Sequence, residues 1–186
     1  REAAEATADE INALAGEAIP QQLDVTDPMA LKVYLASVTV AHQRLDVLVN
    51  NAGINVRSDF RHLADADWLK IRETNLDSVV RLSRDAFDLL RRSGNGAILN
   101  LSSIMASRSM RQLAAYSATK GAVASLSRAL AVEYAPYGIR VNYLCPGFIE
   151  TALTERVLRN PAINKALIDQ TPLRRFGSAE DVAKAA

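Results

Sequence analysis

An apolar run and the turn that follows it, Leu45-Asp46-Val47-Leu48-Val49-Asn50-Asn51-Ala52-Gly53, indicate the fold class. Only Asp46 interrupts the run Leu45–Val49, which is typical of a strand buried in a parallel sheet. Two further apolar runs of similar length follow, at Ala97–Leu101 and Ile139–Leu144. Because each run is followed by polar or turn-forming residues, we expect three short buried strands.

Helical segments separate these runs. Apolar residues recur at helical spacing from about Asp65 to Arg92 and from about Ala115 to Tyr134. Helix start and stop signals predict the remaining elements, which are a helix over Glu2–Ala15, a strand end at Leu23–Val25, a helix from Asp27-Pro28 to about Gln43, and short helices beginning near Asn160-Pro161 and at Ser178. This alternation predicts an α/β fold of the Rossmann type, with a doubly wound parallel sheet and helices on both faces. No composition shift marks a boundary, so we expect residues 1–186 to form one domain.

The composition excludes several classes of protein. Of the 186 residues, 49% are hydrophobic and 23% are charged, which argues against a disordered chain. The formal net charge of +1 creates no basic field for nucleic acid, and no apolar run reaches the roughly 18 residues of a membrane span. The single cysteine, Cys145, cannot form an internal disulfide, so we expect a buried thiol and a cytoplasmic location.

Residues that follow the predicted strands are candidates for a binding site, because ligands of doubly wound sheets bind beyond the carboxyl ends of the strands. Three segments occupy these positions, namely Asn51-Ala52-Gly53, Asn100-Leu101-Ser102-Ser103 and Cys145-Pro146-Gly147-Phe148-Ile149-Glu150-Thr151. The long helix then opens with Tyr116 and Lys120, which are four residues apart and so share one helical face. A nearby ammonium stabilises a phenolate, so we expect Lys120 to lower the pKa of Tyr116 and make it an acid-base group.

In combination, these segments resemble the short-chain dehydrogenase/reductase family. The motifs that carry the resemblance occur in the family's order along nearly the whole chain, and they are Leu48-Val49-Asn50-Asn51-Ala52-Gly53, Thr74-Asn75, Asn100-Leu101-Ser102-Ser103, Tyr116-Ser117-Ala118-Thr119-Lys120-Gly121, Arg140-Val141-Asn142 and Pro146-Gly147-Phe148-Ile149-Glu150-Thr151. The resemblance implies hydride transfer between a nicotinamide cofactor and a carbonyl or alcohol, with no metal.

The resemblance assigns roles to four residues. It implies that Tyr116 is the general acid or base, that Ser103 polarises the substrate carbonyl, and that Lys120 lowers the pKa of Tyr116 and binds the nicotinamide ribose. Asn75 matches a fourth catalytic position, where its carboxamide supports a water relay behind Lys120. The alternative for Asn75 is a structural amide bonded at a helix kink.

Further residues match the family's binding site for NAD or NADP. The resemblance places Asp24 and Val25 at the adenine and Asn51-Ala52-Gly53 at the adenosine ribose. The residues implied at the nicotinamide are Pro146, Gly147, Ile149 and Thr151, together with Tyr116 and Lys120. Asp24 could equally be a turn residue or a helix cap.

The chain departs from the family pattern at its beginning. The family's turn with three glycines, which holds the pyrophosphate at a helix N-terminus, occurs nowhere in the 186 residues. We therefore expect a strand-helix-strand unit of roughly 30 residues or more before Arg1, and a further strand after Ala186. The alternative is a truncated product that cannot hold the cofactor. The residue that distinguishes NAD from NADP would lie just before Arg1.

The substrate remains open at this point. Short segments are similar to gluconate 5-dehydrogenase and related sugar or polyol enzymes, but they also suit 3-oxoacyl-[acyl-carrier-protein] reductases. Four polar residues are expected near the rim of the site, Asn55, Arg57, Arg108 and Arg111, and arginine recognises carboxylates. A protein that keeps the fold as a non-catalytic assembly surface is the alternative from another class.

Two expectations concern assembly and motion. The resemblance implies a dimer or tetramer in which the helix over Asp65–Arg92, and likewise the helix over Ala115–Tyr134, pairs with its copy in another subunit. The helix over 115–134 carries many small and few charged residues, which would leave an apolar outer face, and a wholly internal helix is the alternative. We place Ala124 and Ser125 at the contact between subunits. The segment Thr154–Thr171 is predicted to be a mobile lid over the substrate, with a fixed pair of surface helices as the alternative.

Overall fold

The computed structural model describes residues 2–186, with a three-stranded parallel sheet at its centre. The strands are β1 (Val47–Asn50), β2 (Ala97–Leu101) and β3 (Arg140–Leu144), and they lie in the order β1-β2-β3. In their register Asn50 lies opposite Asn100, and Leu101 lies opposite Leu144. The carboxyl ends of all three strands therefore meet at one edge of the sheet.

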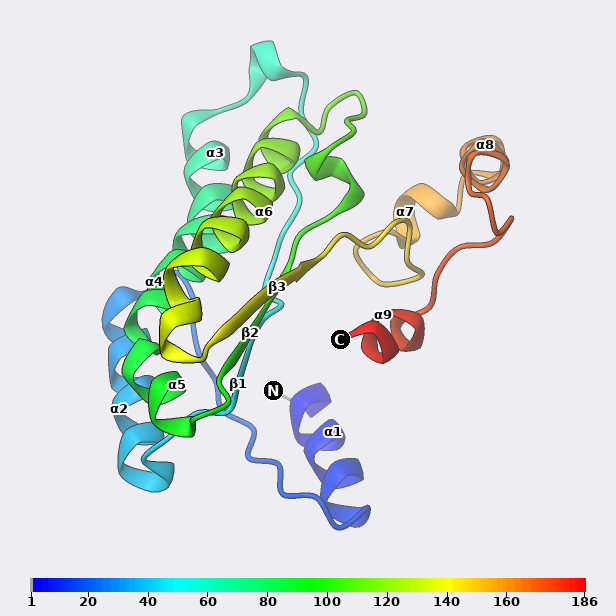
Figure 1. Cartoon of the computed structure of the whole chain (residues 1–186). Coiled ribbons are helices and arrows are strands. Elements are labelled where there is room, and N and C mark those ends of the chain that lie inside the picture. Colours follow the sequence, from blue (N-terminus) through cyan, green and yellow to red (C-terminus); the bar gives the residue numbers. More distant parts are fainter. Residues whose placement is uncertain (1) are drawn as a thin grey trace.

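Helices cover the sheet from two sides, as expected for a doubly wound fold. They are α1 (Glu2–Ala13), α2 (Pro28–His42), α3 (Asp65–Arg72), α4 (Ser78–Asp85), α5 (Phe87–Ser93), α6 (Ala114–Tyr134), α7 (Glu155–Leu158), α8 (Pro161–Gln170) and α9 (Ala179–Ala185). Figure 1 shows α2 to α6 on one side of the strands and α1 and α9 on the other. The predicted fold class is confirmed. In the described residues no helix has the length and apolar character needed to cross a membrane.

Local signals in the sequence set the beginnings of three helices. Asp27 accepts hydrogen bonds from the backbone of Met29 and Ala30, and Pro28 occupies the first turn of α2. Asn160 caps α8 in the same way, and Ser178 forms a reciprocal capping box with Asp181 at α9. The start signals predicted for these helices are confirmed.

The core lies between β1–β3 and the helices α2, α5 and α6. Its buried residues are Leu35, Ala86, Leu89, Leu90, Ile98, Ile139 and Val141. Phe87 packs edge-on against Tyr134 and Tyr137, with ring centroids 5.0 and 4.9 Å apart. This apolar layer anchors α6 to the strands at the end away from the site.

The predicted strand at Leu23–Val25 does not form. Asp24 instead accepts hydrogen bonds from the backbone and the hydroxyl of Thr26, which closes a turn. A strand also needs a hydrogen-bonded neighbour, and β1 pairs only with β2 in the described part of the chain. Val47 and Val49 are 55% and 50% exposed, because their side chains lie on the face of β1 opposite the one that packs on the core through Leu48, so the prediction of a buried strand is wrong for β1.

The predicted continuous helix over 65–92 is interrupted twice. A π-helical turn at Glu73–Asp77 separates α3 from α4, and a short break at Ala86 separates α4 from α5. The hydroxyl of Ser78 donates to the carbonyl of Thr74 at 2.6 Å, within this irregular stretch. Gly94, at φ 76°, ends α5 in the left-handed region.

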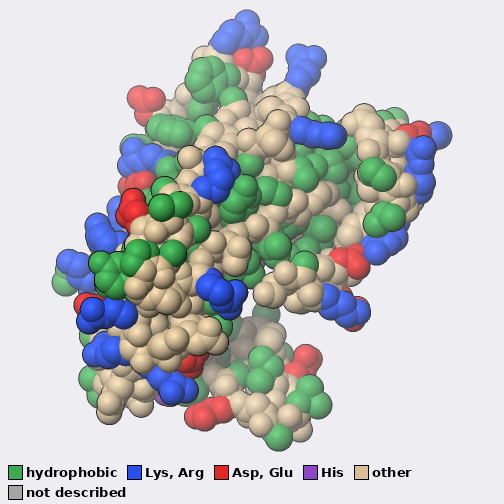
Figure 2. Space-filling model, viewed as in Figure 1, with side chains coloured by type: hydrophobic (Ala, Val, Ile, Leu, Met, Phe, Trp, Pro, Cys, Tyr) green, Lys and Arg blue, Asp and Glu red, His purple; other side chains and the backbone are tan. Residues whose placement is uncertain are grey.

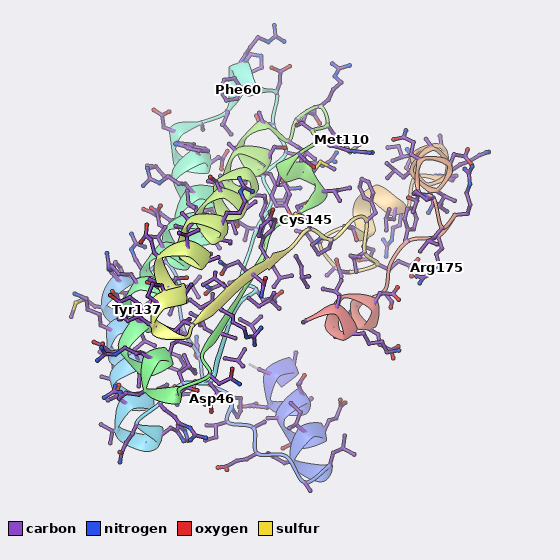
Figure 3. All side chains as sticks on the ribbon, in the orientation of Figure 1. Asp46, Phe60, Met110, Tyr137, Cys145 and Arg175 are labelled. Carbon is purple, nitrogen blue, oxygen red and sulfur yellow. The ribbon has the colours of Figure 1, made fainter. Side chains whose placement is uncertain are left out.

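Two expectations about single residues are wrong. Cys145 is exposed at the carboxyl end of β3, as Figure 3 shows, because the chain leaves the sheet there and turns at Pro146. Ala124 is only 5% exposed, because it lies on the side of α6 that packs into the protein, whereas Ser125 is exposed. A substitution at Ala124 would therefore disturb the core rather than a subunit contact.

A short backbone bridge joins the two ends of the segment 150–176. Glu150 donates its backbone N–H to the carbonyl of Gly177, and Gly177 donates to the carbonyl of Phe148, both at 2.9 Å. A methyl group on Gly177 would lie 2.5 Å from Cδ1 of Ile149, so a side chain at this position would require the Ile149 side chain to move. The helices α7 and α8 therefore lie in a segment whose two ends are held together by this bridge.

Candidate active site

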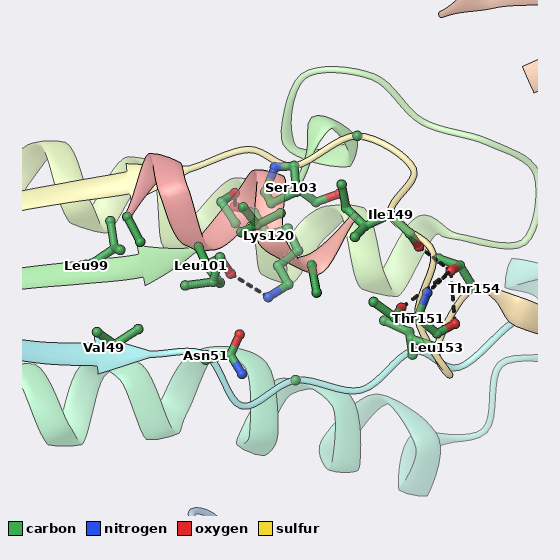
Figure 4. Close-up of a pocket in the computed structure, with 18 of the residues that line it drawn as sticks. Val49, Asn51, Leu99, Leu101, Ser103, Lys120, Ile149, Thr151, Leu153 and Thr154 are labelled. Atoms are coloured by element: carbon green, nitrogen blue, oxygen red, sulfur yellow. Dashed lines mark hydrogen bonds between the residues drawn. The ribbon is translucent and has the colours of Figure 1, made fainter. Parts of the chain in front are cut away.

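A cavity of about 510 Å³ opens at the carboxyl ends of the strands. Figure 4 shows Asn51 pointing into it from the loop after β1, with Ser103 and Lys120 on the other side. The cavity brings together nine of the residues predicted from the sequence, namely Asn51, Gly53, Ser103, Tyr116, Lys120, Pro146, Gly147, Ile149 and Thr151. They come from four separate segments of the chain, so the fold itself assembles the site.

Lys120 occupies the floor of this cavity. Its side chain is 5% exposed, and its Nζ donates a hydrogen bond of 2.6 Å to the carbonyl of Leu101 at the end of β2. Burial disfavours the charged amine and lowers the pKa of Lys120 from 10.5 to about 8. Lys120 is therefore still mostly protonated at neutral pH, and it places a positive charge inside a largely apolar site.

Tyr116 lies one turn before Lys120 on α6, and Nζ of Lys120 is 5.8 Å from the centre of its ring. Burial raises the pKa of the Tyr116 phenol, and a hydrogen bond with Ser103 partly counters this effect. The net shift is upward, because burial is the largest contribution, and the lowering of this pKa by Lys120 stays a prediction.

Ser103 links the phenol to the backbone after β2. Its side chain is buried, and its Oγ accepts a hydrogen bond of 3.1 Å from the backbone N–H of Met105. With an acceptor site of Ser103 occupied by Met105, the hydroxyl can turn its proton toward the cavity. Ser103 and Tyr116 thus present two hydroxyl groups to the same small volume.

Asn75 lies in the π-helical turn, directly behind this group, and is fully buried. Its Oδ1 accepts from the backbone N–H of Ile54 at 2.8 Å, while its Nδ2 donates to the carbonyl of Ile54 at 2.9 Å. A methyl group on Gly53 would lie 3.4 Å from Nζ of Lys120 and 3.5 Å from Oδ1 of Asn75. The carboxamide of Asn75 therefore holds the loop after β1 close to Lys120. This structural role is similar to the alternative of a structural amide at a helix kink. The part of Asn75 in a water relay stays a prediction.

The remaining predicted residues lie around a second cavity of about 440 Å³. Val25 and Ala52 line it, and Val49 and Asn51 line both this cavity and the first. Asp24 is exposed beside it, and its hydrogen bonds with Thr26 lower its pKa. The residues predicted for the two ends of a dinucleotide thus lie on either side of the end of β1.

Several buried polar residues were not predicted. Thr119 donates to the carbonyl of Tyr116 at 2.9 Å and accepts from Nδ2 of Asn75 at 3.3 Å, so it connects α6 to the π-helical turn. The hydroxyl of Ser102 donates to the carbonyl of Lys120 at 2.8 Å. Thr119 precedes Lys120 and Ser102 precedes Ser103 in the family motifs of the sequence. This position next to a predicted catalytic residue was the one signal that could have identified Thr119 and Ser102.

A second polar group crosses the middle of the sheet. Asn50 donates to Oδ1 of Asn100 at 2.8 Å, and Asn100 donates to Oγ of Ser127 at 2.8 Å. Asn50 follows one predicted strand directly and Asn100 lies within the next, but their contact depends on the register of β1 with β2, which no local pattern reveals.

Comparison with known proteins places this geometry in a family. A sequence model of the family described as enoyl-(acyl carrier protein) reductase matches residues 1–186. The chain belongs to the short-chain dehydrogenase/reductase family. The resemblance inferred from the ordered motifs is confirmed.

Individual members of the short-chain dehydrogenase/reductase family match most of the chain. A tropinone reductase homolog of Arabidopsis thaliana is 39% identical over 140 residues, which are 75% of this chain and 53% of the relative. The 3-oxoacyl-[acyl-carrier-protein] reductase of Escherichia coli (strain K12) is 36% identical over 163 residues, 88% of this chain and 66% of the relative. The chain therefore spans about half to two thirds of the length of these relatives.

The fold matches solved structures of the same family. The crystal structure of a gluconate 5-dehydrogenase from Burkholderia cenocepacia J2315, in complex with NADP and tartrate, superposes with a TM-score of 0.93 at 29% identity. The superposition covers 99% of this chain and 72% of the other. This solved gluconate 5-dehydrogenase thus shares the arrangement of this chain.

Proposed function

We propose that this chain carries the catalytic groups of an NAD(P)-dependent oxidoreductase, which transfers a hydride between nicotinamide and a carbonyl or secondary alcohol. The observation that supports it best is the convergence of Ser103, Tyr116 and Lys120 on one wall of one cavity. The gluconate 5-dehydrogenase of Burkholderia cenocepacia, which was solved with NADP, has the same fold.

The residues present fit a nicotinamide nucleotide. A methyl group on Gly147 would meet no atom within 4 Å, so the backbone there borders open space beside Ile149 and Thr151. Lys120 would hold the ribose that joins the nicotinamide, Asn51-Ala52-Gly53 would line the adenosine ribose, and Asp24 and Val25 would hold the adenine beside the second cavity. When bound, the nicotinamide supplies or accepts the hydride.

The protein's own groups handle the proton. In reduction, Tyr116 donates its phenolic proton to the carbonyl oxygen while Ser103 donates a hydrogen bond to the same oxygen. The charged Lys120 then stabilises the phenolate that remains. In oxidation the proton moves the other way, from the alcohol to Tyr116, and Asn75 keeps the loop after β1 against Lys120 in both directions.

The proposal is tested by following absorbance at the nicotinamide band with the full chain, both cofactors, and a panel of sugar acids, polyols and 3-oxoacyl thioesters. We propose a sugar acid, a polyol or a related small keto compound as substrate. A 3-oxoacyl-[acyl-carrier-protein] reductase is the second candidate, favoured by the 36% identity to the Escherichia coli enzyme. No turnover with any substrate in either direction would instead support a non-catalytic assembly protein.

Carbonyl reduction is expected to slow as the pH rises through about 8. The pKa of Lys120 lies at about 8, so its ammonium is lost above that value, whereas Tyr116 keeps its proton because its pKa is raised. The kcat of reduction, measured at saturating cofactor from about pH 6 to pH 10, tests this expectation. A flat profile across pH 8 would contradict the role of the Lys120 charge.

We further propose that the protein is a cytoplasmic, single-domain homo-oligomer, a homotetramer or a dimer. Ser125, Ala129 and Val132 form an exposed stripe along α6, and Val132 is 75% exposed. Ser125→Arg is expected to dissociate the assembly in sedimentation velocity, because two α6 helices could not then approach closely. Ser37→Arg, on the exposed face of α2, serves as the control. An unchanged oligomer in Ser125→Arg would place the contact elsewhere.

The segment Thr154–Thr171 is proposed to close over the substrate. It contains α7 and α8, Thr154 lines the first cavity, and the hydroxyl of Thr154 donates to the carbonyl of Ile149. Hydrogen exchange of its backbone amides is expected to slow when cofactor and substrate are added. Equal protection in both states would favour the alternative of two fixed surface helices.

A further inference from the structure

A third cavity, of about 640 Å³, lies on the other side of the segment after β3. Gly147 and Ile149 line both this cavity and the first one. The segment Ile104–Met110, which begins directly after Ser103, also lines the third cavity. The backbone N–H of Ile104 donates to the carbonyl of Pro146 at 3.0 Å, so this segment lies next to the one that follows β3. The cavity therefore adjoins the reacting hydroxyl groups.

The walls of this cavity are mainly apolar, and Ser107, Ser109, Gln170 and Thr171 add polar groups to them. Met105, Leu167 and Phe176 line it and are each less than 10% exposed, at 7%, 5% and 8%. The rings of Phe148 and Phe176 pack with their centroids 6.4 Å apart. In Figure 2 hydrophobic side chains gather in the furrow between the central body and the lobe of α7 and α8, and Figure 3 places Met110 and Arg175 on its two sides.

The two arginines of the cavity differ in their partners. Arg175 donates to both carboxylate oxygens of Asp181, at 2.6 and 3.2 Å, so its charge is balanced. Arg108 is exposed at the rim, and among residues 2–186 no carboxylate lies within ion-pair distance of its guanidinium in the structure. The cavity thus combines an apolar interior with one uncompensated positive charge at its edge.

We infer that this cavity, here named the Phe148 cavity, binds the hydrocarbon part of the substrate while Arg108 binds a carboxylate at the far end of that chain. The inference rests on the proposed function and names its substrate class as oxo or hydroxy acids whose reacting carbon and carboxylate are separated by an aliphatic chain. A single guanidinium balances the charge of one carboxylate and can bind it through two parallel hydrogen bonds.

The buried apolar side chains of the Phe148 cavity suit the aliphatic part of such a substrate. Met105, Leu167 and Phe176 would cover its CH₂ groups, whose removal from water is favourable. Ser107, Ser109, Gln170 and Thr171 also line the cavity, so hydroxyl groups on the chain can find hydrogen-bond partners. The carboxylate at the far end is therefore the feature that distinguishes the inferred substrate within the proposed function.

The test compares 7-oxooctanoate with its neutral methyl ester, using the full chain and saturating cofactor. Arg108→Ala is expected to lower kcat/KM for the acid about 10- to 100-fold and to leave the ester unchanged. Arg61→Ala is the matched control, because Arg61 lies on the neighbouring loop and is paired with Asp59. Leu167→Trp should fill the cavity and lower kcat/KM for both long compounds while sparing acetone.

Calorimetric binding of 7-oxooctanoate to the protein separates failure of this inference from failure of the proposed function. Tighter binding of the acid than of the ester, lost in Arg108→Ala, supports the inference even where no turnover is found. Equal losses for acid and ester in Arg108→Ala, or an unchanged affinity in both Arg108→Ala and Leu167→Trp, overturn it. Absence of turnover with every compound bears on the proposed function alone.

Discussion

Tyr116→Phe is expected to lower kcat by about two to four orders of magnitude, the usual contribution of a positioned proton donor. The substitution keeps the ring and removes only the hydroxyl that hydrogen-bonds with Ser103. Cofactor affinity should change little, because Lys120 keeps its bond to the carbonyl of Leu101. Steady-state kinetics and a fluorescence titration with NADH and NADPH measure the two effects separately.

Tyr137→Phe is the matched control for this experiment. Tyr137 is 49% exposed and contacts Phe87 at the opposite end of α6, so its hydroxyl should not matter for catalysis. A Tyr116→Phe variant that retains most of its activity would remove Tyr116 from the mechanism. A loss of cofactor affinity equal to the loss of kcat would instead indicate a role in binding.

Lys120→Met is expected to abolish activity and to make the fold more stable. The variant loses the ammonium that stabilises the phenolate and holds the ribose, so both kcat and cofactor affinity should fall. Burial that lowers the pKa of Lys120 from 10.5 to about 8 corresponds to about 3 kcal/mol of penalty for the charged form. Because the bond to Leu101 is also lost, we expect a net gain of about 1–3 kcal/mol.

The gain in stability should depend on pH. Below about pH 8 both the folded and the unfolded wild-type chains carry a charged Lys120, and the penalty is fully present. Between about pH 8 and 10.5 the unfolded chain binds more protons, so wild-type stability rises and the difference from Lys120→Met shrinks. Thermal unfolding at pH 7 and pH 10 measures this change, with Lys70→Met on the surface of α3 as control. A Tm for Lys120→Met below that of wild type at pH 7 would contradict the burial penalty.

Much of the fold was predictable because its signals are local. The caps at Asp27, Asn160 and Ser178 each act within one turn of helix, so the residues that set the boundary are neighbours in sequence. The strand Ala97–Leu101 was predicted at its observed bounds, because it is paired on both sides and buried as its pattern requires. Tyr116 and Lys120 share a helix face by spacing alone.

The features that were missed depend on contacts between distant segments. The π-helical turn forms where Asn75 bonds to Ile54, and no periodicity in residues 65–92 marks that place. The apolar run at β1 predicts burial, but the exposure of Val47 and Val49 depends on whether another element packs over their face of the strand. The raised pKa of Tyr116 likewise reflects how much protein surrounds it, which the distance from Lys120 in sequence cannot express.

The backbone bridge between Ile149 and Gly177 also has a consequence for how substrate range can change. Because both ends of the segment 150–176 meet at one point, its length and sequence can vary without altering where the chain leaves β3 or where α9 begins. The segment 150–176 can therefore be exchanged as a unit, while the strands and the remaining helices stay as they are. A graft of the corresponding segment from another enzyme of this fold should therefore transfer preference for a substrate while Ser103, Tyr116 and Lys120 stay in place, which makes recombination at these two positions an efficient route to new specificities.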